Sequence, residues 1–370
     1  MIKVMNIFGT RPEAIKMAPI VQELKSRKEI DCKVCVTAQH REMLDQVLNV
    51  FNIKPDYDLN IMKQGQTLSD ITSGVLTKVE DVIKKEEPDL ILVHGDTTTT
   101  LAGATAAFYN KVKVGHVEAG LRTWNLDSPF PEEANRQMVD CITDYYFTPT
   151  EKTKENLIEE GKEEKKIFVT GNSAIDALKT TVKKDYTHPI FKWIGNDKLI
   201  LLTAHRRENL GENMYNMFKA IKRVVDENNG IKVIYPVHLN PQVRKIANDV
   251  FKDDKKIKLI EPLDVVDFHN FLNKAYIILT DSGGIQEEAP SLGKPVLVLR
   301  NTTERPEGIE AGTLKLATTN EETIYKLLTD LLQNKESYEK MAKASNPYGD
   351  GNTSKKIADI IIEQLNERKE

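Results

Sequence analysis

The chain of 370 residues is predicted to fold as an α/β protein with two Rossmann-like, doubly wound domains. Three observations lead to this prediction. Short β-rich runs alternate with helix-length amphipathic stretches along almost the whole sequence. Several of these runs, such as LILV, LILLT and YIILT, are almost entirely apolar, as in strands buried on both faces of a parallel sheet. At about 150 residues per domain, the length fits two or three domains, and the two series of strands favour two.

The predicted strands form two consecutive series. The first series lies at residues 3–8, 33–37, 90–94, 113–117, 145–147 and 166–169. The second lies at residues 199–203, 232–237, 257–260, 276–280 and 295–299. Amphipathic patterns at 14–28, 68–86 and 213–227 are long enough to be crossover helices.

The boundary between the domains is expected between Gly171 and Lys198, where no clean strand is found. We therefore expect an N-terminal domain at residues 1–172 and a C-terminal domain at 173–353. A last helix, within 354–370, follows the turn-rich segment NPYGDGN and could pack on either domain. In parallel sheets, ligands bind at the carboxyl ends of strands, where the unusual residues of this sequence fall. The pattern thus predicts a cleft between the two domains.

The composition is that of an ordinary globular enzyme. Lys and Arg total 52 and Asp and Glu total 56, which gives a net charge of −4 and argues against a nucleic-acid partner. No apolar run approaches the length of a membrane span, and the first residues lack an apolar signal core. Three cysteines are too few for a disulfide framework. We expect a cytoplasmic protein that does not bind membranes.

A phosphate site is suggested where Ser282, Gly283 and Gly284 connect an apolar strand to a helix. Glycines allow backbone N–H groups to approach an anion, and the helix dipole favours a phosphate there. Glu288, one turn further, could accept hydrogen bonds from ribose hydroxyls. An ordinary strand-to-helix turn explains the same residues, so both interpretations stay open. The sequence has no GxGxxG after a strand and no GxxxxGK[ST], which disfavours dinucleotide and Walker-type sites.

Cationic side chains stand at or near the same strand ends and could neutralise a diphosphate without a metal. Taken singly, each is better explained as a solvated surface charge, and it is their shared position at strand ends that favours a phosphate site. These residues are Arg11, Lys16, Arg206, Arg207 and Arg305.

Carboxylates gather in the first half of the chain, with His94, His116 and Arg136 nearby in sequence. Mutual repulsion and burial are expected to raise the pKa values of such carboxylates, which suits general acids and bases. Salt-bridged loop ends are an equally good explanation. A metal site is disfavoured, because Arg and Lys stand beside the carboxylates and no HExxH is present. The carboxylates are Asp96, Glu118, Glu132 and Glu133.

Short sequence motifs spread along the entire chain resemble those of the non-hydrolysing UDP-N-acetylglucosamine 2-epimerases. The matching stretches occur in the order of that family. They are GTRPEAIKMAP (9–19), AQHREMLDQVL (38–48), HGDTTTTLAGA (94–104), GHVEAGLRT (115–123), PFPEEANR (129–136), TAHRREN (203–209), PVHLNP (236–241), TDSGGIQEEAPSLGKPVL (280–297) and TTERPE (302–307).

The resemblance implies the fold of the GT-B glycosyltransferases, with the last helix crossing back to the first domain. It also implies an isomerase, usually homodimeric, that interconverts UDP-GlcNAc and UDP-ManNAc without NAD, other cofactors or a metal. UDP would be eliminated across C1–C2 and added back to bound 2-acetamidoglucal after protonation of the opposite face. The product would supply ManNAc-type sugars for cell-surface polysaccharide.

The resemblance also assigns roles to residues of this chain. Asp96, Glu118 and Glu132 would be the acid and base carboxylates, with His205 beside the diphosphate. Which carboxylate serves which face of the sugar is left open. The remaining substrate-binding residues would be Arg11, Lys16, Arg136, Phe268, Ser282, Gly283, Gly284, Glu288 and Arg305.

Several bacterial members of the family bind a second UDP-GlcNAc as an activator, at positions that correspond to Gln39 and His238. This chain has Glu42 where relatives have Gln and Gly65 where they have Arg, so whether it is activated stays open. The nearest alternative function is a hydrolysing 2-epimerase that releases free ManNAc and UDP. A glycosyltransferase and a catalytically silent UDP-sugar sensor are weaker alternatives, because no acceptor site is visible and the acid–base residues are all present.

Overall fold

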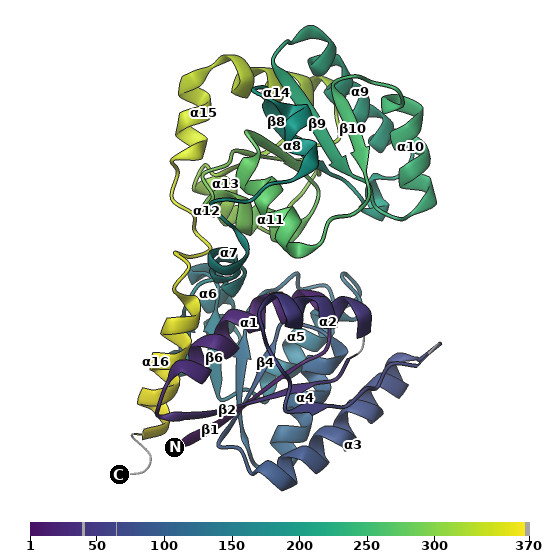
Figure 1. Cartoon of the computed structure of the whole chain (residues 1–370). Helices are drawn as coiled ribbons and strands as arrows, with labels where there is room; N and C mark the ends of the chain where they lie inside the picture. The colour runs from purple at the N-terminus through teal and green to yellow at the C-terminus, as the bar shows by residue number, and fades with distance from the viewer. Residues whose placement is uncertain (39–40, 64, 367–370) are drawn as a thin grey trace. The chain divides into compact units, whose positions relative to one another are not determined.

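The structure, a computed structural model, describes residues 1–38, 41–63 and 65–366, with the backbone alone at 41–43. It divides into two compact units (Figure 1). Unit 1 holds residues 1–179 and the described residues from 348 onward; unit 2 holds residues 180–347. The predicted boundary follows residue 172, whereas this division follows residue 179. The difference arises because Asp176 accepts hydrogen bonds from the backbone N–H groups of Thr353 and Ser354, which tie its helix to the last helix of unit 1.

Unit 1 is built on a seven-stranded parallel sheet with the strand order β3-β2-β1-β4-β5-β6-β7. Its strands are β1 (Ile2–Phe8), β2 (Ile30–Val36), β3 (Tyr57–Asp58), β4 (Leu90–His94), β5 (Lys113–Val117), β6 (Tyr145–Thr148) and β7 (Ile167–Val169). Its helices are α1 (Arg11–Ser26), α2 (Arg41–Val50), α3 (Leu68–Glu86), α4 (Thr98–Tyr109), α5 (Glu132–Cys141), α6 (Glu151–Glu159), α7 (Ser173–Thr181) and α16 (Thr353–Asn366).

Helices cover both faces of this sheet, which explains the almost continuous apolar strands. Val4 of β1 faces a core formed with α1, α2 and α16. Its neighbour Met5 faces the opposite core, formed with α3, α4 and α5. Since successive side chains of a strand point to opposite faces, both must be apolar. The last helix, α16, lies along α1 (Figure 1).

Unit 2 repeats the architecture on a six-stranded parallel sheet with the order β10-β9-β8-β11-β12-β13. Its strands are β8 (Lys198–Thr203), β9 (Ile231–Pro236), β10 (Ile257–Ile260), β11 (Ile277–Thr280), β12 (Val296–Val298) and β13 (Leu314–Leu316). Its helices are α8 (Pro189–Ile194), α9 (Glu212–Glu227), α10 (Pro241–Phe251), α11 (Val265–Lys274), α12 (Gly283–Ser291), α13 (Pro306–Glu310), α14 (Glu321–Gln333) and α15 (Lys335–Ala342).

Both sheets have the doubly wound strand order of a Rossmann domain, and the predicted GT-B-like α/β class is confirmed. Every predicted strand is present, with ends shifted by no more than three residues. The short strands β3 and β13 were not predicted, because runs of two or three residues carry no readable periodicity. Among the described residues, no helix is both long and apolar enough to cross a membrane.

Because all strands of a sheet run in parallel, their carboxyl ends lie along one edge. In unit 1 this edge carries the segments after β1, β4 and β5, and helices begin there with side-chain caps. Thr10 caps α1 in a capping box with Glu13, and Thr97 caps α4. Helix α1 therefore begins at Arg11, earlier than the predicted residue 14. These caps fix the backbone from which the candidate site residues project.

Candidate active site

The carboxyl ends of β4 and β5 hold two of the predicted acid–base residues close together. The backbone N–H of Gly95 donates to the carbonyl of Val117 at 2.9 Å. Asp96 and Glu118, the next residues along the chain, therefore begin side by side at the ends of neighbouring strands. Asp96 accepts a hydrogen bond of 2.6 Å from Nη2 of Arg136 on α5. The backbone of Glu118 has a φ of +64°, a left-handed conformation that residues other than glycine rarely adopt and that often marks functional sites.

Glu118 is largely buried, with 10% of its side chain exposed, and is surrounded by groups that favour its charged form. Its Oε2 atom bonds to Nζ of Lys16, accepts a hydrogen bond of 3.1 Å from Asn172 and lies 3.5 Å from Nε2 of buried His94. Burial opposes ionisation, but the charge of Lys16 and the contact with His94 outweigh it and hold the pKa of Glu118 well below its ordinary value. The expectation that clustering raises the carboxylate pKa values is therefore wrong for Glu118. The nearest charge to this carboxylate is the ammonium of Lys16, which lowers its pKa.

A different buried carboxylate, Glu13, ties the β1 and β4 ends together. Its Oε2 accepts hydrogen bonds from the backbone N–H groups of Gly9 at 3.0 Å and Thr10 at 2.7 Å. Its Oε1 accepts from the hydroxyls of Thr97 at 2.7 Å and Thr100 at 3.2 Å. Glu13 thus fixes the loop that leads to Arg11, which is exposed at the start of α1. The sequence analysis did not single out Glu13, although its place three residues after Thr10 is a capping-box signal.

The neighbours Glu132 and Glu133 have different surroundings. Glu133 is fully buried and accepts hydrogen bonds from the backbone N–H groups of Thr123 and Trp124 and from Gln137 and Arg136. Burial opposes its ionisation, but these donors together lower its pKa. Glu132 is half-buried, and its side chain has no hydrogen bond or ion pair with any described residue. Glu133 therefore holds the loop before α5, whereas Glu132 is available for other partners.

His116 supports the loop that carries Asp96 and belongs to a network of charged residues in which His116, Asp140 and the side chain of Arg122 are fully buried. Its Nδ1 lies 2.6 Å from Oδ1 of Asp140, and its Nε2 lies 2.7 Å from the carbonyl of Gly95. Asp140 also accepts a hydrogen bond of 2.6 Å from Arg122, which is bonded in turn to Glu160. Burial opposes ionisation of Asp140, but His116 and Arg122 lower its pKa. His116 thus acts as a support for the Gly95–Asp96 backbone.

In unit 2, His205 follows β8 and is held by Asp281 at the end of β11. Oδ2 of Asp281 accepts hydrogen bonds from the backbone N–H groups of His205 and Arg206, both at 2.9 Å. The ring of His205 stacks on that of His238, with centroids 5.4 Å apart. Burial, assisted by His238 and Arg206, lowers the pKa of His205 against the opposing effect of Asp281. The structure therefore favours a neutral imidazole with 42% of its side chain exposed.

Helix α12 begins directly after β11, with Ser282 as the residue before its first turn and Gly283 and Gly284 as its first residues. Ser282 makes no side-chain cap, so its hydroxyl does not satisfy the first N–H groups of the helix. Glu288 lies one turn further, with Oε2 at 3.5 Å from Nε2 of buried His269 on α11. Half-buried Phe268 precedes His269 on the same helix. The predicted phosphate, ribose and base residues of unit 2 thus come from the adjoining segments α11 and α12.

Arg305 is bonded to two carboxylates. Its Nε donates to Glu287 at 2.8 Å, and its Nη1 lies 2.8 Å from Oε1 of Glu304. A β-carbon at Gly283 would lie 3.1 Å from the guanidinium carbon of Arg305, so this glycine makes room for the arginine beside the helix start. The sequence placed Arg305 near a phosphate but did not indicate Glu304.

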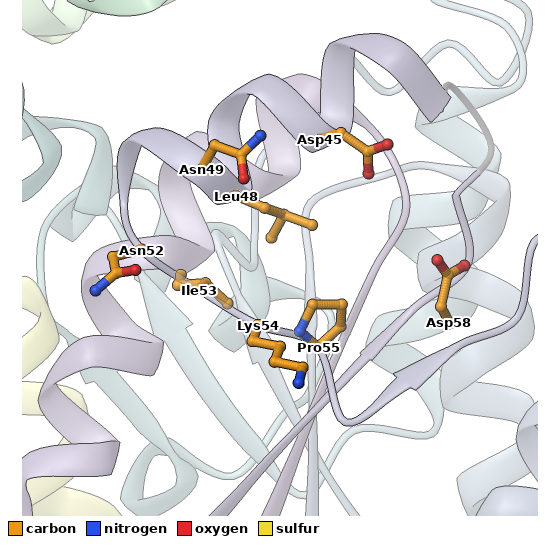
Figure 2. Close-up of a pocket in the computed structure, with 8 residues that line it drawn as sticks. All are labelled: Asp45, Leu48, Asn49, Asn52, Ile53, Lys54, Pro55 and Asp58. Carbon is orange, nitrogen blue, oxygen red and sulfur yellow. The ribbon is translucent and has the colours of Figure 1, made fainter.

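Two further observations concern the rest of the chain. Figure 2 shows a surface pocket of about 410 Å³ in unit 1 that none of the predicted site residues lines. Its lining is Asp45, Leu48, Asn49, Asn52, Ile53, Lys54, Pro55 and Asp58. Of the predicted activator residues, Gln39 lies outside the described residues, as does the side chain of Glu42. Within the described ranges, no group of three or more His, Cys, Asp or Glu side chains could hold a metal ion.

The buried Glu133 provides a pH-dependent test of this local structure. Replacement Glu133→Gln is expected to lower the free energy of unfolding at pH 7 by about 2 kcal/mol, because charge-assisted hydrogen bonds are lost. The pKa of Glu133 is lower in the folded state, so its contribution is complete above its ordinary pKa and is lost on acidification. The difference between variant and wild type should therefore shrink as the pH falls below about 4.5.

Denaturant unfolding of both proteins at several pH values measures this difference. Glu132→Gln is the matched control, because Glu132 is the adjacent residue on the same helix and has no partner among the described residues. Its unfolding free energy should stay within about 0.5 kcal/mol of wild type. A Glu133→Gln effect that is absent at pH 7, or that grows on acidification, contradicts the assignment.

Comparisons with known proteins identify the family of this chain. The family model for UDP-N-acetylglucosamine 2-epimerase matches residues 22–362. The UDP-N-acetylglucosamine 2-epimerase of Bacillus subtilis is 63% identical over 369 residues, covering 100% of this chain and 97% of that protein.

Two solved structures are similar throughout. The UDP-GlcNAc 2-epimerase from Neisseria meningitidis, bound to UDP-GlcNAc, is 50% identical with a TM-score of 0.88, covering 98% of this chain and 100% of that one. The enzyme from Methanocaldococcus jannaschii, in complex with UDP-GlcNAc and UDP, is 37% identical with a TM-score of 0.79, covering 98% and 99%. The chain belongs to the UDP-N-acetylglucosamine 2-epimerase family.

Proposed function

We propose that this protein is an isomerase that reversibly converts UDP-GlcNAc to UDP-ManNAc by eliminating and re-adding UDP. The observation that carries the proposal is the pair of carboxylates at adjacent strand ends, Asp96 and Glu118, which are bonded to two different cations, Arg136 and Lys16. The relatives supply the substrate, since the Neisseria and Methanocaldococcus enzymes are named for UDP-GlcNAc and solved with it.

The chemistry follows from the substrate. The hydrogen on C2 is not adjacent to a carbonyl, so direct deprotonation is too unfavourable. Cleavage of the C1–O bond, with its electron pair leaving on UDP, gives C1 positive character and acidifies C2–H. A base then takes the C2 proton and a C1=C2 double bond forms, which gives 2-acetamidoglucal. Protonation of C2 from the opposite face and attack of a UDP oxygen on C1 complete the epimerisation.

The proposed acid–base residues of unit 1 are Asp96, Glu118 and Glu132. Because its pKa is held low, Glu118 begins the cycle ionised and can accept a proton but not donate one. Lys16 balances its charge, and Arg136 does the same for Asp96. Movement of a proton onto Glu118 would remove the negative charge beside Lys16, which would then interact more strongly with the developing negative charge of the substrate. Arg11, exposed at the start of α1, would bind phosphate or sugar.

The proposed UDP-binding residues of unit 2 are those around α12. The first N–H groups of α12, with Ser282, Gly283 and Gly284, would bind phosphate, since they offer donors at the positive end of a helix. Arg305 supports them from beside Gly283. Glu288 would accept hydrogen bonds from the ribose and Phe268 would contact the uracil. Neutral His205 would lie beside the leaving diphosphate and donate a hydrogen bond to it from its ring N–H group.

A proton NMR time course with UDP-GlcNAc in D₂O, without added metal or NAD, tests the reaction itself. We expect UDP-ManNAc to appear beside UDP-GlcNAc, with deuterium at C2 of both, because the proton leaves to a base that exchanges with solvent. Free ManNAc with an equal amount of UDP would instead show the hydrolysing epimerase. No change at all would contradict both enzymes.

The acid–base assignment is tested by Asp96→Asn and Glu118→Gln. Each should lower kcat by about two orders of magnitude or more, while binding of UDP by calorimetry persists, because the amide keeps the shape but cannot exchange a proton. Glu80→Gln, which removes a carboxylate paired with Lys84 on the surface of α3, is the control and should leave kcat unchanged. Retention of turnover in either site variant would remove that residue from the mechanism.

We also propose that the enzyme is a cytoplasmic homodimer and that a second UDP-GlcNAc activates it through a site that includes His238. The rate curve for UDP-GlcNAc should then be sigmoidal and become hyperbolic in His238→Ala. His238 stacks on His205, so Leu239→Ala, at an adjacent side chain that is 65% exposed, is the control for local disturbance. A hyperbolic curve in the wild type would contradict activation by a second UDP-GlcNAc.

A further inference from the structure

Glu304 is a carboxylate held by three arginines, and the proposed reaction gives it no role. Its Oε1 lies 2.8 Å from Nη1 of Arg305 and 3.5 Å from Nη2 of Arg206. Its Oε2 accepts a hydrogen bond of 2.6 Å from Nη1 of Arg300. Burial opposes ionisation, but Arg305, Arg300 and Arg206 together lower the pKa of Glu304 to about 2. An ionised carboxylate is thus the common partner of three guanidinium groups, two from its own segment between β12 and α13 and one from the segment after β8.

The cluster stands beside the start of α12, where the phosphates of UDP are proposed to bind. A β-carbon built on Gly283 would lie 3.0 Å from Oε1 of Glu304 and 3.1 Å from the guanidinium carbon of Arg305. Arg206 is also part of the segment after β8, where its Nε donates to the carbonyl of Asp281 at 3.0 Å. The three arginines and the glycine turn therefore lie around the same small volume. The anion in that volume is the carboxylate of Glu304.

We propose that Glu304 is a built-in counter-anion of the diphosphate site, with which the phosphates of the bound nucleotide compete for Arg206, Arg300 and Arg305. This inference rests on the proposed function, in that it takes the start of α12 as the phosphate site. It makes Glu304 a residue that weakens nucleotide binding and so limits how tightly UDP is retained.

Glu304 is expected to weaken UDP binding whether its carboxylate stays in place or moves when the phosphates bind. If its carboxylate stays in place, it repels the incoming phosphates at short range. If it moves away, it loses charge-assisted hydrogen bonds to three guanidinium groups. Both responses weaken binding relative to a side chain of the same shape without the charge. Glutamine is such a side chain, and its amide oxygen can still accept a hydrogen bond from one arginine.

A purely structural carboxylate predicts the opposite result. If Glu304 served only to orient the arginines for the phosphates, its removal would let three like charges move apart and would weaken UDP binding. The two roles can therefore be separated by the sign of one measured change.

The test is isothermal titration of UDP into wild type and Glu304→Gln, with melting curves to show that each is folded. We expect UDP to bind Glu304→Gln about tenfold more tightly, with a steeper dependence on salt, because one more positive charge is left for the ligand. Glu208→Gln is the matched control. Glu208 contacts the same Arg300 at 3.3 Å, but its side chain is 57% exposed, so its removal should leave the affinity for UDP unchanged.

The possible results separate this inference from the proposed function. Absence of UDP binding in the wild type would overturn the proposed function itself. Binding in the wild type that is unchanged or weaker in folded Glu304→Gln would overturn the counter-anion alone. Glu304→Ala removes the same charge and carries the same expectation if the Gln variant does not fold. Failure of both variants to fold would also refute the inference, because it would show Glu304 to be required for the fold.

Discussion

The loops that carry the candidate site residues of both units are held in place by buried carboxylates. These carboxylates lie at the ends of parallel strands and accept hydrogen bonds from backbone N–H groups. A parallel sheet places its loops along one edge but does not shape them. In unit 1, Glu13 holds the loop after β1 and Glu133 holds the loop before α5. In unit 2, Asp281 holds the backbone of His205 and Arg206. Each of these carboxylates is buried and receives several donors, so each loop has one stable conformation.

The same chemical group therefore has two uses in this protein, distinguished by its partners. A carboxylate surrounded by backbone N–H groups is fixed by the fold, since moving it would leave several buried donors unsatisfied. Glu118 and Asp96 are instead bonded to the long side chains of Lys16 and Arg136, which can exchange one anion for another. A substrate phosphate or a transferred proton can alter such a pair without unfolding a loop. This difference explains why Glu133, although it stands beside Glu132, is a support and not an acid or base.

The fold could be predicted from the sequence to a large extent, because apolar runs, helix periodicity and strand ends are local signals. The long strands and the crossover helices are all present, whereas the short strands β3 and β13 depend on neighbouring strands and leave no local pattern. The positions of the site residues at strand ends could also be predicted. Their partners could not, since Lys16 and Glu118 are 102 residues apart in the chain and the contact depends on the packing of α1.

The protonation state of the site carboxylates could not be predicted correctly from the sequence, for a definable reason. Proximity of acidic residues in a sequence suggests repulsion, but the pKa of a buried carboxylate depends on which charge lies nearest in space. For Glu118 that charge is Lys16, and for Glu304 it is a set of three arginines, so both carboxylates stay ionised despite burial. Each cation is then already paired before any ligand arrives. In such a site, the number of arginines and lysines alone does not determine how strongly an anion binds. The binding strength also depends on the free energy needed to separate these cations from the protein's own carboxylates.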